Sequence, residues 1–180
     1  MSEVFKERVG ALSDGMVAIA TTLLVLGLKV TERFSLSSEQ LFTWSRIFLG
    51  WVISFVMIAI FWFENHLILA RVSKCTVPLT VVIFVHLGLL SLIPFGSNLI
   101  MDKPQSLAAA ITFSGIMTAN GVCSAVAAFL LSRTPEIHNK PGSAEFMGRR
   151  SIFQIIAYVL VAAISMLGAY LHHPFLGVVL

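Results

Sequence analysis

Apolar residues form long runs along the chain, and polar residues gather in the short stretches between them. A helix needs about 20 residues to cross the roughly 30 Å hydrocarbon core of a bilayer. The pattern predicts five such helices, at residues 9–28, 47–70, 77–101, 107–131 and 152–171. The runs do not alternate between apolar and polar residues, which disfavours a transmembrane barrel. We therefore expect an all-α, polytopic membrane helix bundle.

A sixth apolar run, at residues 174–180, is too short to span a bilayer. We interpret it as the start of a truncated sixth helix, cut at residue 180. The N-terminus mixes acidic and basic residues and no small-residue cleavage site follows the first run, so no removable signal peptide is expected. Because no loop is long enough for a soluble domain, residues 1–180 are predicted to form a single transmembrane domain.

The composition agrees with a membrane protein, since 57% of the residues are hydrophobic and only 12% are charged. Of the 12 Lys and Arg residues, eight lie at the N-terminus and in alternate loops, and four lie on the other side. The positive-inside rule then places the N-terminus in the cytoplasm. Because these cations lie in short loops, they indicate orientation rather than nucleic-acid binding. The eight are Lys6, Arg8, Arg71, Lys74, Arg133, Lys140, Arg149 and Arg150.

No motif indicates an enzyme. The sequence has no glycine-rich phosphate loop and no metal-ligand signature, and Ser13 beside Asp14 lacks a base on the same helix. Cys75 and Cys123 are isolated thiols without metal-type spacing. We expect no catalytic residue, no metal and no cofactor.

The first apolar segment contains an acid, Asp14. An ionised carboxylate in hydrocarbon costs on the order of several kcal/mol unless it is paired, so we expect Asp14 to be buried in helix packing beside polar partners. Trp62 and His66 lie at a matching depth on the second predicted helix and share one face. Considered singly, His66 is better explained as a neutral histidine near the headgroups and Trp62 as an aromatic-belt residue, whereas together with Asp14 at a matching depth they favour a polar network.

One face of the first predicted helix carries Ile19, Thr22, Leu23 and Leu26. At about 100° per residue they fall in a stripe roughly 100° wide. On the residues alone, such a stripe is more often helix packing than the lining of a pore.

These segments resemble the transmembrane protein 175 family of potassium channels. Arg8, then Ser13-Asp14 and the runs Ala-Ile and Thr-Leu-Leu-Val-Leu, is similar to the opening helix of that family. The Trp-x-x-x-His pattern of the second helix and the sequence Leu-Ile-Pro-Phe around Pro94, which predicts a helix break, are also similar. The chain departs from the family at Leu12, where Phe is preferred, and at Gly27, where an acid is common.

The resemblance implies a potassium-preferring cation channel, a homotetramer with the first helix around the pore. By position, Ile19 would be the hydrophobic constriction, with Leu23 and Leu26 further along the pore. Thr22 would match the hydroxyl ring implicated in preferring potassium. The permeant ions would be potassium and other monovalent cations.

The resemblance also implies a structural hydrogen-bond network behind the pore. Its members would be Arg8, Ser13, Asp14, Trp62 and His66. Arg8 and Asp14 are six residues apart and do not share a helix face, so a direct pairing would need a bend or a neighbouring helix.

The expected partners are further copies of the chain and membrane lipid, in the plasma membrane of a prokaryote. A secondary ion transporter is an alternative, although it predicts an internal repeat and midplane charges that this chain lacks. A haem- or metal-binding membrane protein would use His66, His86, His172 and His173, whose predicted depths disagree. A non-conducting structural subunit is a third alternative.

Overall fold

A computed structural model describes residues 3–28, 38–103 and 106–134, together with residues 149, 152 and 156. The first three stretches contain five helices: α1 (Glu3–Val25), α2 (Ser38–Arg71), α3 (Val77–Ser91), α4 (Ile93–Asp102) and α5 (Leu107–Ser132). Four segments are long and apolar enough to cross a membrane, namely α1, α2, α3 with α4, and α5. The predicted all-helical class is confirmed.

The described residues contain four such segments, so the predicted count of five with a truncated sixth is not supported. The predicted segments at 152–171 and 174–180 lie outside the described residues, apart from positions 152 and 156. The first two helices also begin earlier than predicted, at residues 3 and 38 instead of 9 and 47. Hydropathy marks only the apolar part of a helix, whereas backbone hydrogen bonding continues into the polar turns before it.

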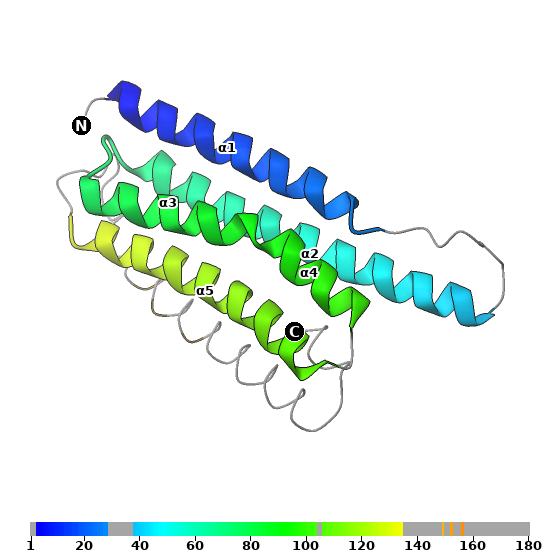
Figure 1. Ribbon diagram of the computed structural model, residues 1–180. Helices are drawn as coiled ribbons and strands as arrows, with labels where there is room; N and C mark the ends of the chain where they lie inside the picture. Colours follow the sequence, from blue (N-terminus) through cyan, green and yellow to red (C-terminus); the bar gives the residue numbers. More distant parts are fainter. Residues whose placement is uncertain are drawn as a thin grey trace.

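The helices are arranged with α1 and α5 on opposite sides and with α2, α3 and α4 between them (Figure 1). Both α1 and α5 pack against all three of these middle helices. The N-terminal end of α1 lies at the same end of the bundle as the turn from α2 to α3 (Figure 1).

Local sequence explains where the later helices begin and where the third span breaks. Thr76 and Ser106 are the N-caps of α3 and α5, and each side chain accepts a hydrogen bond from a backbone N–H of the first turn. The break between α3 and α4 falls at Leu92, two residues before Pro94. A proline has no N–H and its ring clashes with the preceding turn, so the predicted break is present for the expected reason.

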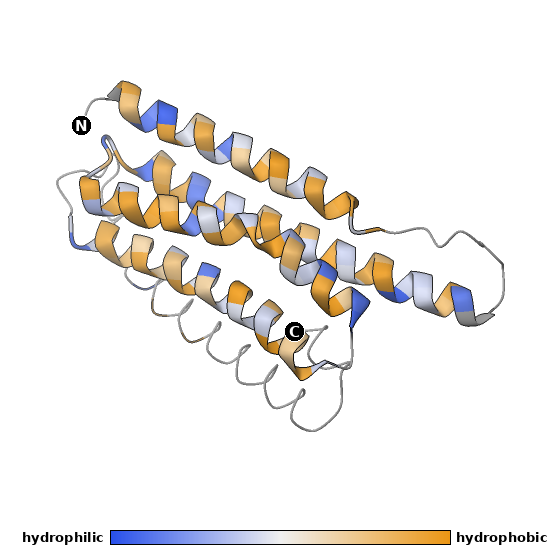
Figure 2. Ribbon diagram, in the orientation of Figure 1, coloured by the Kyte–Doolittle hydropathy of each residue, from blue (hydrophilic) through white to orange (hydrophobic). Residues whose placement is uncertain are grey.

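The core consists of two apolar clusters with a band of polar residues between them. The first cluster contains Val9, Ile68, Ile83 and Ala127, and the second contains Ala20, Phe61, Leu90 and Met117. Along α1, α2, α3 and α5, which each contribute to both clusters, buried polar residues lie between members of the two clusters. Hydrophilic positions interrupt the apolar colouring of the ribbon (Figure 2). We call six of these residues the polar layer: Ser13, Glu64, Asn65, His86, Asn120 and Ser124.

Candidate pore-lining site

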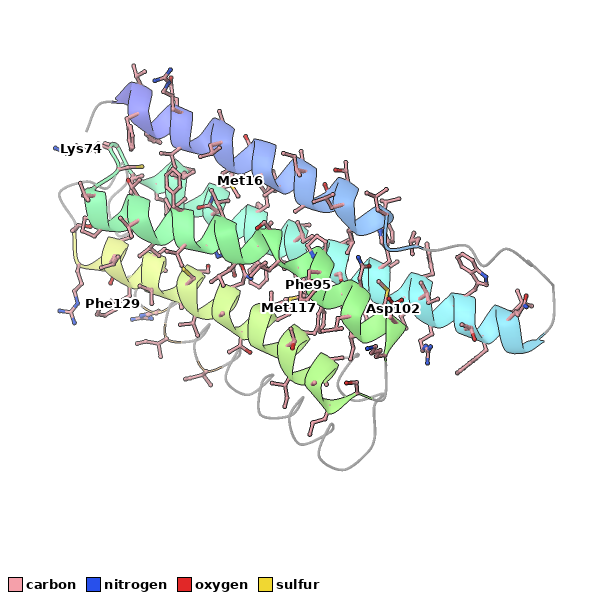
Figure 3. The ribbon with its side chains drawn as sticks, viewed as in Figure 1. Met16, Lys74, Phe95, Asp102, Met117 and Phe129 are labelled. Carbon is pink, nitrogen blue, oxygen red and sulfur yellow. The ribbon has the colours of Figure 1, made fainter. Side chains whose placement is uncertain are left out.

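Helix α1 presents two different faces. Val9, Ser13, Ala20 and Leu24 are at most 3% exposed and follow helical spacing, so they form the stripe that packs on the bundle. Other side chains project from the outer side of α1, away from the remaining helices (Figure 3). Only 22% of the apolar window of α1 is buried, compared with 50% for α5. The single chain therefore leaves most of the surface of α1 open.

The predicted pore residues all lie on this open surface. Ile19 is 61% exposed, Leu23 is 44% exposed and Leu26, in the turn that follows the helix, is 74% exposed. Thr22 is exposed as well, and its Oγ1 donates a hydrogen bond of 2.8 Å to the carbonyl oxygen of Ile19. Because the hydroxyl hydrogen points to the helix backbone, the oxygen presents its lone pairs as acceptors.

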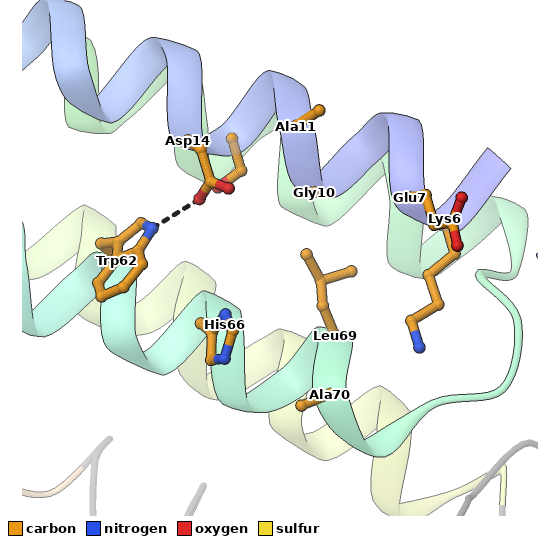
Figure 4. Close-up of a pocket in the computed structure, with 10 residues that line it drawn as sticks. Lys6, Glu7, Gly10, Ala11, Asp14, Trp62, His66, Leu69 and Ala70 are labelled. Carbon is orange, nitrogen blue, oxygen red and sulfur yellow. Dashed lines mark hydrogen bonds between the residues drawn. The ribbon is translucent and has the colours of Figure 1, made fainter. Parts of the chain in front are cut away.

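Four of the five predicted network residues line a cleft of about 410 Å³ between α1 and α2 (Figure 4). Nε1 of Trp62 donates a hydrogen bond of 2.8 Å to Oδ1 of Asp14. The Trp62 ring stacks on His66 with ring centroids 5.6 Å apart and an interplanar angle of 30°. Ser13 also borders the cleft, but its buried hydroxyl accepts a hydrogen bond of 2.6 Å from Nδ2 of Asn65. These contacts join α1 to α2.

Two network residues differ in placement from the expectation. Asp14 is exposed in the single chain, not buried in helix packing. The reason is that α1 touches the bundle by a narrow stripe, which Ser13 occupies, and Asp14 lies about 100° further round the helix. Arg8 is exposed and does not line the cleft, whereas Lys6 does and donates a hydrogen bond of 2.8 Å to the carbonyl oxygen of Val72. A role for Arg8 in the network stays a prediction.

Apart from Ser13, the residues of the polar layer were not recognised from the sequence as members of a structural network. Glu64 is 7% exposed, and its Oε2 accepts a hydrogen bond of 2.6 Å from Oγ of Ser124 on α5. The available signal was an acid within an apolar run, the same signal that drew attention to Asp14. His86 was weighed only as a metal or haem ligand, although it lies in the polar layer beside these groups.

The histidines do not converge on a metal site in the part of the chain that the structure describes. His66 is exposed in the cleft, whereas His86 is buried in the polar layer. No group of three or more His, Cys, Asp or Glu among the described residues could hold a metal ion. His172 and His173 lie outside these residues.

The turn between α2 and α3 contains a buried thiol, Cys75. Burial raises the pKa of this thiol above its ordinary value, and the nearby positive charge of Lys6 opposes that shift in part. A buried thiol of this kind is a poor nucleophile and serves as a small apolar side chain in the first cluster.

Comparison with known proteins finds a family that this chain resembles. The family described as the endosomal/lysosomal potassium channel TMEM175 matches residues 8–94. The crystal structure of a lysosomal potassium-selective channel TMEM175 homolog from Chamaesiphon minutus superimposes with a TM-score of 0.79 at 25% identity, covering 98% of this chain and 94% of that one. Over residues 8–94, and in its fold, the chain resembles the TMEM175 family.

The proteins to which this chain is similar include two bacterial potassium channels. It is 33% identical over 120 residues to one from Chamaesiphon minutus, which is 62% of this chain and 59% of that protein. It is 27% identical over 166 residues to one from a Chryseobacterium species, which is 92% of this chain and 85% of that protein. An endosomal/lysosomal proton channel from Gallus gallus is 28% identical over 181 residues.

The chain spans about three fifths of the Chamaesiphon minutus relative, 59%, and about a third of the Gallus gallus relative, 35%. The TMEM175 family is a family of channels and not of enzymes. The likeness to this channel family, together with four segments long and apolar enough to cross a membrane, supports a multi-pass membrane protein.

Proposed function

We propose that this chain is the subunit of a potassium-preferring cation channel and that α1 lines its pore. The observation that carries the proposal is the open surface of α1, where Ile19, Leu23 and Leu26 are exposed in the single chain. In a channel family, an apolar helix face that its own bundle does not cover is explained by an assembly that places it around a pore.

A single α1 cannot enclose a pore, so the proposal requires several copies. Soluble and membrane homo-oligomers favour closed symmetry, and we propose a homotetramer with four copies of α1 around one axis. A ring of Ile19 side chains would then form a hydrophobic neck. Such a neck excludes water, so a hydrated ion passes only when the ring widens.

The proposed preference for potassium rests on Thr22. The sequence contains no Thr-Val-Gly-Tyr-Gly segment, whose carbonyl oxygens replace the hydration shell in other potassium channels. The Thr22 oxygen would act as an acceptor for a partly dehydrated cation one turn from Ile19. Selectivity built from one hydroxyl ring and a narrow neck should be modest.

The cleft residues would hold the pore helix in place. The hydrogen bond from Trp62 to Asp14 ties the open side of α1 to α2, and the inward hydrogen bond of Ser13 ties its buried side. The remaining parts of this proposal are a cytoplasmic N-terminus and a place in a prokaryotic plasma membrane.

The test is ion flux from liposomes that contain the purified protein, first under a potassium gradient and then under a sodium gradient. We expect a fast leak that prefers potassium. Ile19→Asn should wet the neck, so flux should rise and the preference for potassium should fall. The matched control is Ile111→Asn, an exposed isoleucine on α5, on the opposite side of the bundle. Equal effects of the two substitutions would remove Ile19 from the pore, and saturable, counter-ion-coupled flux would favour a secondary transporter.

A further inference from the structure

Three consecutive residues of α4, Gly96, Ser97 and Asn98, lie against three different parts of the bundle. Gly96 packs so closely on α5 that a Cβ atom at this position would lie 2.9 Å from Cδ1 of Ile116. Oγ of Ser97 accepts a hydrogen bond of 2.8 Å from Oγ of Ser54 on α2, and both serines are buried. Successive helical residues diverge by about 100°, so one turn of α4 reaches all three neighbours.

Asn98 lies against the turn that follows α1, whose C-terminal end passes beside α4 (Figure 1). Its carboxamide occupies the place that a side chain at Gly27 would take. A Cβ atom there would lie 2.6 Å from Cγ of Asn98 and 3.0 Å from its Nδ2, and closer still to its Oδ1. These distances are shorter than the roughly 3.5 Å at which nonbonded carbon atoms pack.

The contact explains why position 27 is a glycine. The φ angle of Gly27 is outside the left-handed region, so its backbone would accept an alanine. The requirement for glycine comes instead from the carboxamide of Asn98, which leaves no room for a Cβ atom. The departure from the family pattern at Gly27, where an acid is common, therefore has a steric reason.

The contact joins a firmly held helix to a loosely held one. The apolar window of the span made by α3 and α4 is 44% buried, compared with 22% for α1. If Asn98 and residue 27 were forced apart, α1 would therefore move more easily than α4. Leu26 lies in the same turn as Gly27, on the open surface of α1, and is 74% exposed. Movement away from α4 would carry Leu26 toward the proposed pore.

We propose that Asn98 is a positioning residue for the pore, because its carboxamide fixes the turn that follows α1 and with it the position of Leu26. Oδ1 of Asn98 is buried without an N–H or O–H donor among the described residues. It faces Cα of Gly27, whose C–H group is a weak donor. The inference rests on the proposed function, since it requires that α1 lines the pore.

The test compares the effect of Gly27→Ala in two backgrounds, the native chain and Asn98→Ala. With Asn98 present, the added methyl group displaces the end of α1, and potassium flux per folded protein in liposomes should fall by about threefold or more, as for coupled residues in contact. In Asn98→Ala the methyl group has room, so Gly27→Ala should change the flux by less than about twofold. An equal loss in both backgrounds, or no loss in either, would overturn the role of Asn98.

The matched control is Gly115→Ala on α5, because nothing lies within 4 Å of a Cβ atom at that glycine. This substitution should change the flux by less than about twofold. A loss as large as that of Gly27→Ala would show that the contact with Asn98 is not the cause, and would overturn the inference.

Thermal unfolding of the same variants in detergent separates this inference from the proposed function, since it requires no ion conduction. Gly27→Ala should lower the unfolding temperature only when Asn98 is present. A native chain that does not conduct but shows this pattern would refute the proposed function and leave the contact intact. A conducting chain without the pattern would refute the inference alone. If Gly27→Ala gives no folded protein, adding Asn98→Ala should restore the yield, and no recovery would overturn the inference.

Discussion

One short segment of α2, residues 61–66, contributes to two polar sites, the cleft beside α1 and the buried polar layer. Trp62, which is 36% exposed, and the exposed His66 lie in the cleft beside α1. Glu64 and Asn65 are buried in the polar layer, with partners on α5 and α1. Successive helical residues diverge by about 100°, so neighbours in the sequence reach opposite surroundings.

The polar layer and the cleft differ in how far a single chain completes their contacts. The polar layer satisfies most of its groups within one chain, and its hydrogen bonds are shielded from solvent. The cleft is open, and the hydrogen bond from Trp62 to Asp14 is exposed. We therefore expect substitutions in the layer to act on the stability of the subunit and substitutions in the cleft to act on the position of α1.

The largest difference in the free energy of unfolding is expected between substitutions at two adjacent positions, Asn65 and His66. Asn65→Leu removes the amide that donates a hydrogen bond to the buried Ser13 hydroxyl. The free energy of unfolding should fall by about 1–3 kcal/mol, because the hydroxyl oxygen then has lost its donor. His66→Leu changes an exposed ring and should cost less than about 0.5 kcal/mol. Thermal unfolding of the purified chain in detergent measures both. The reverse order of stability would break the distinction between layer and cleft.

A smaller effect is expected at Ser124. Ser124→Ala removes the hydrogen bond to the buried Glu64 carboxylate and should lower the free energy of unfolding by about 1–2 kcal/mol. Ser114 is the matched control, since it is also a buried serine on α5 but donates to the carbonyl oxygen of Ala110 in its own helix. Ser114→Ala should cost about 0.5 kcal/mol or less, since alanine favours a helix. Equal losses would show that the link between α2 and α5 contributes nothing.

The smallest effect is expected in the cleft, at Trp62. Trp62→Phe removes the indole donor to Asp14 but keeps an aromatic ring against His66, so we expect a loss of about 1 kcal/mol or less and a reduced yield of oligomer. Trp51 on the same helix is the control, because its buried Nε1 has no hydrogen-bond partner among the described residues. Trp51→Phe should leave oligomer yield, measured by size-exclusion chromatography, unchanged. A normal yield from both variants would mean that the cleft does not position α1.

Much of the fold was predictable because a membrane limits the choices. Backbone polar groups in hydrocarbon must be paired within a helix or barrel, so long apolar runs identified the four described spans. Pro94 marked the break in the third span, because a proline cannot donate the backbone hydrogen bond. The polar first turns of α1 and α2 were missed because they carry no hydropathy signal.

The candidate site was predictable only where side chains lie four residues apart and therefore share one helix face. Trp62 and His66 share a helix face, and their contact follows from that spacing. The burial of Glu64 against Ser124 did not follow, because it depends on how α2 and α5 are turned toward each other. The exposure of Asp14 was missed for the same reason, since sequence does not reveal how narrow the packed stripe of α1 is.

The length of α2 has a consequence for the protein in its membrane. The helix contains 34 residues. At about 1.5 Å per residue it is roughly 20 Å longer than a hydrocarbon core of about 30 Å. Its N-terminal end extends beyond the neighbouring helices (Figure 1). In a thicker bilayer these N-terminal turns of α2 would lie closer to the hydrocarbon, which costs free energy for their polar side chains. A change in the tilt of α2 relative to the membrane normal would lower that cost. Because the same helix carries both polar sites, a change in bilayer thickness would act on the packing of the subunit and on the position of α1.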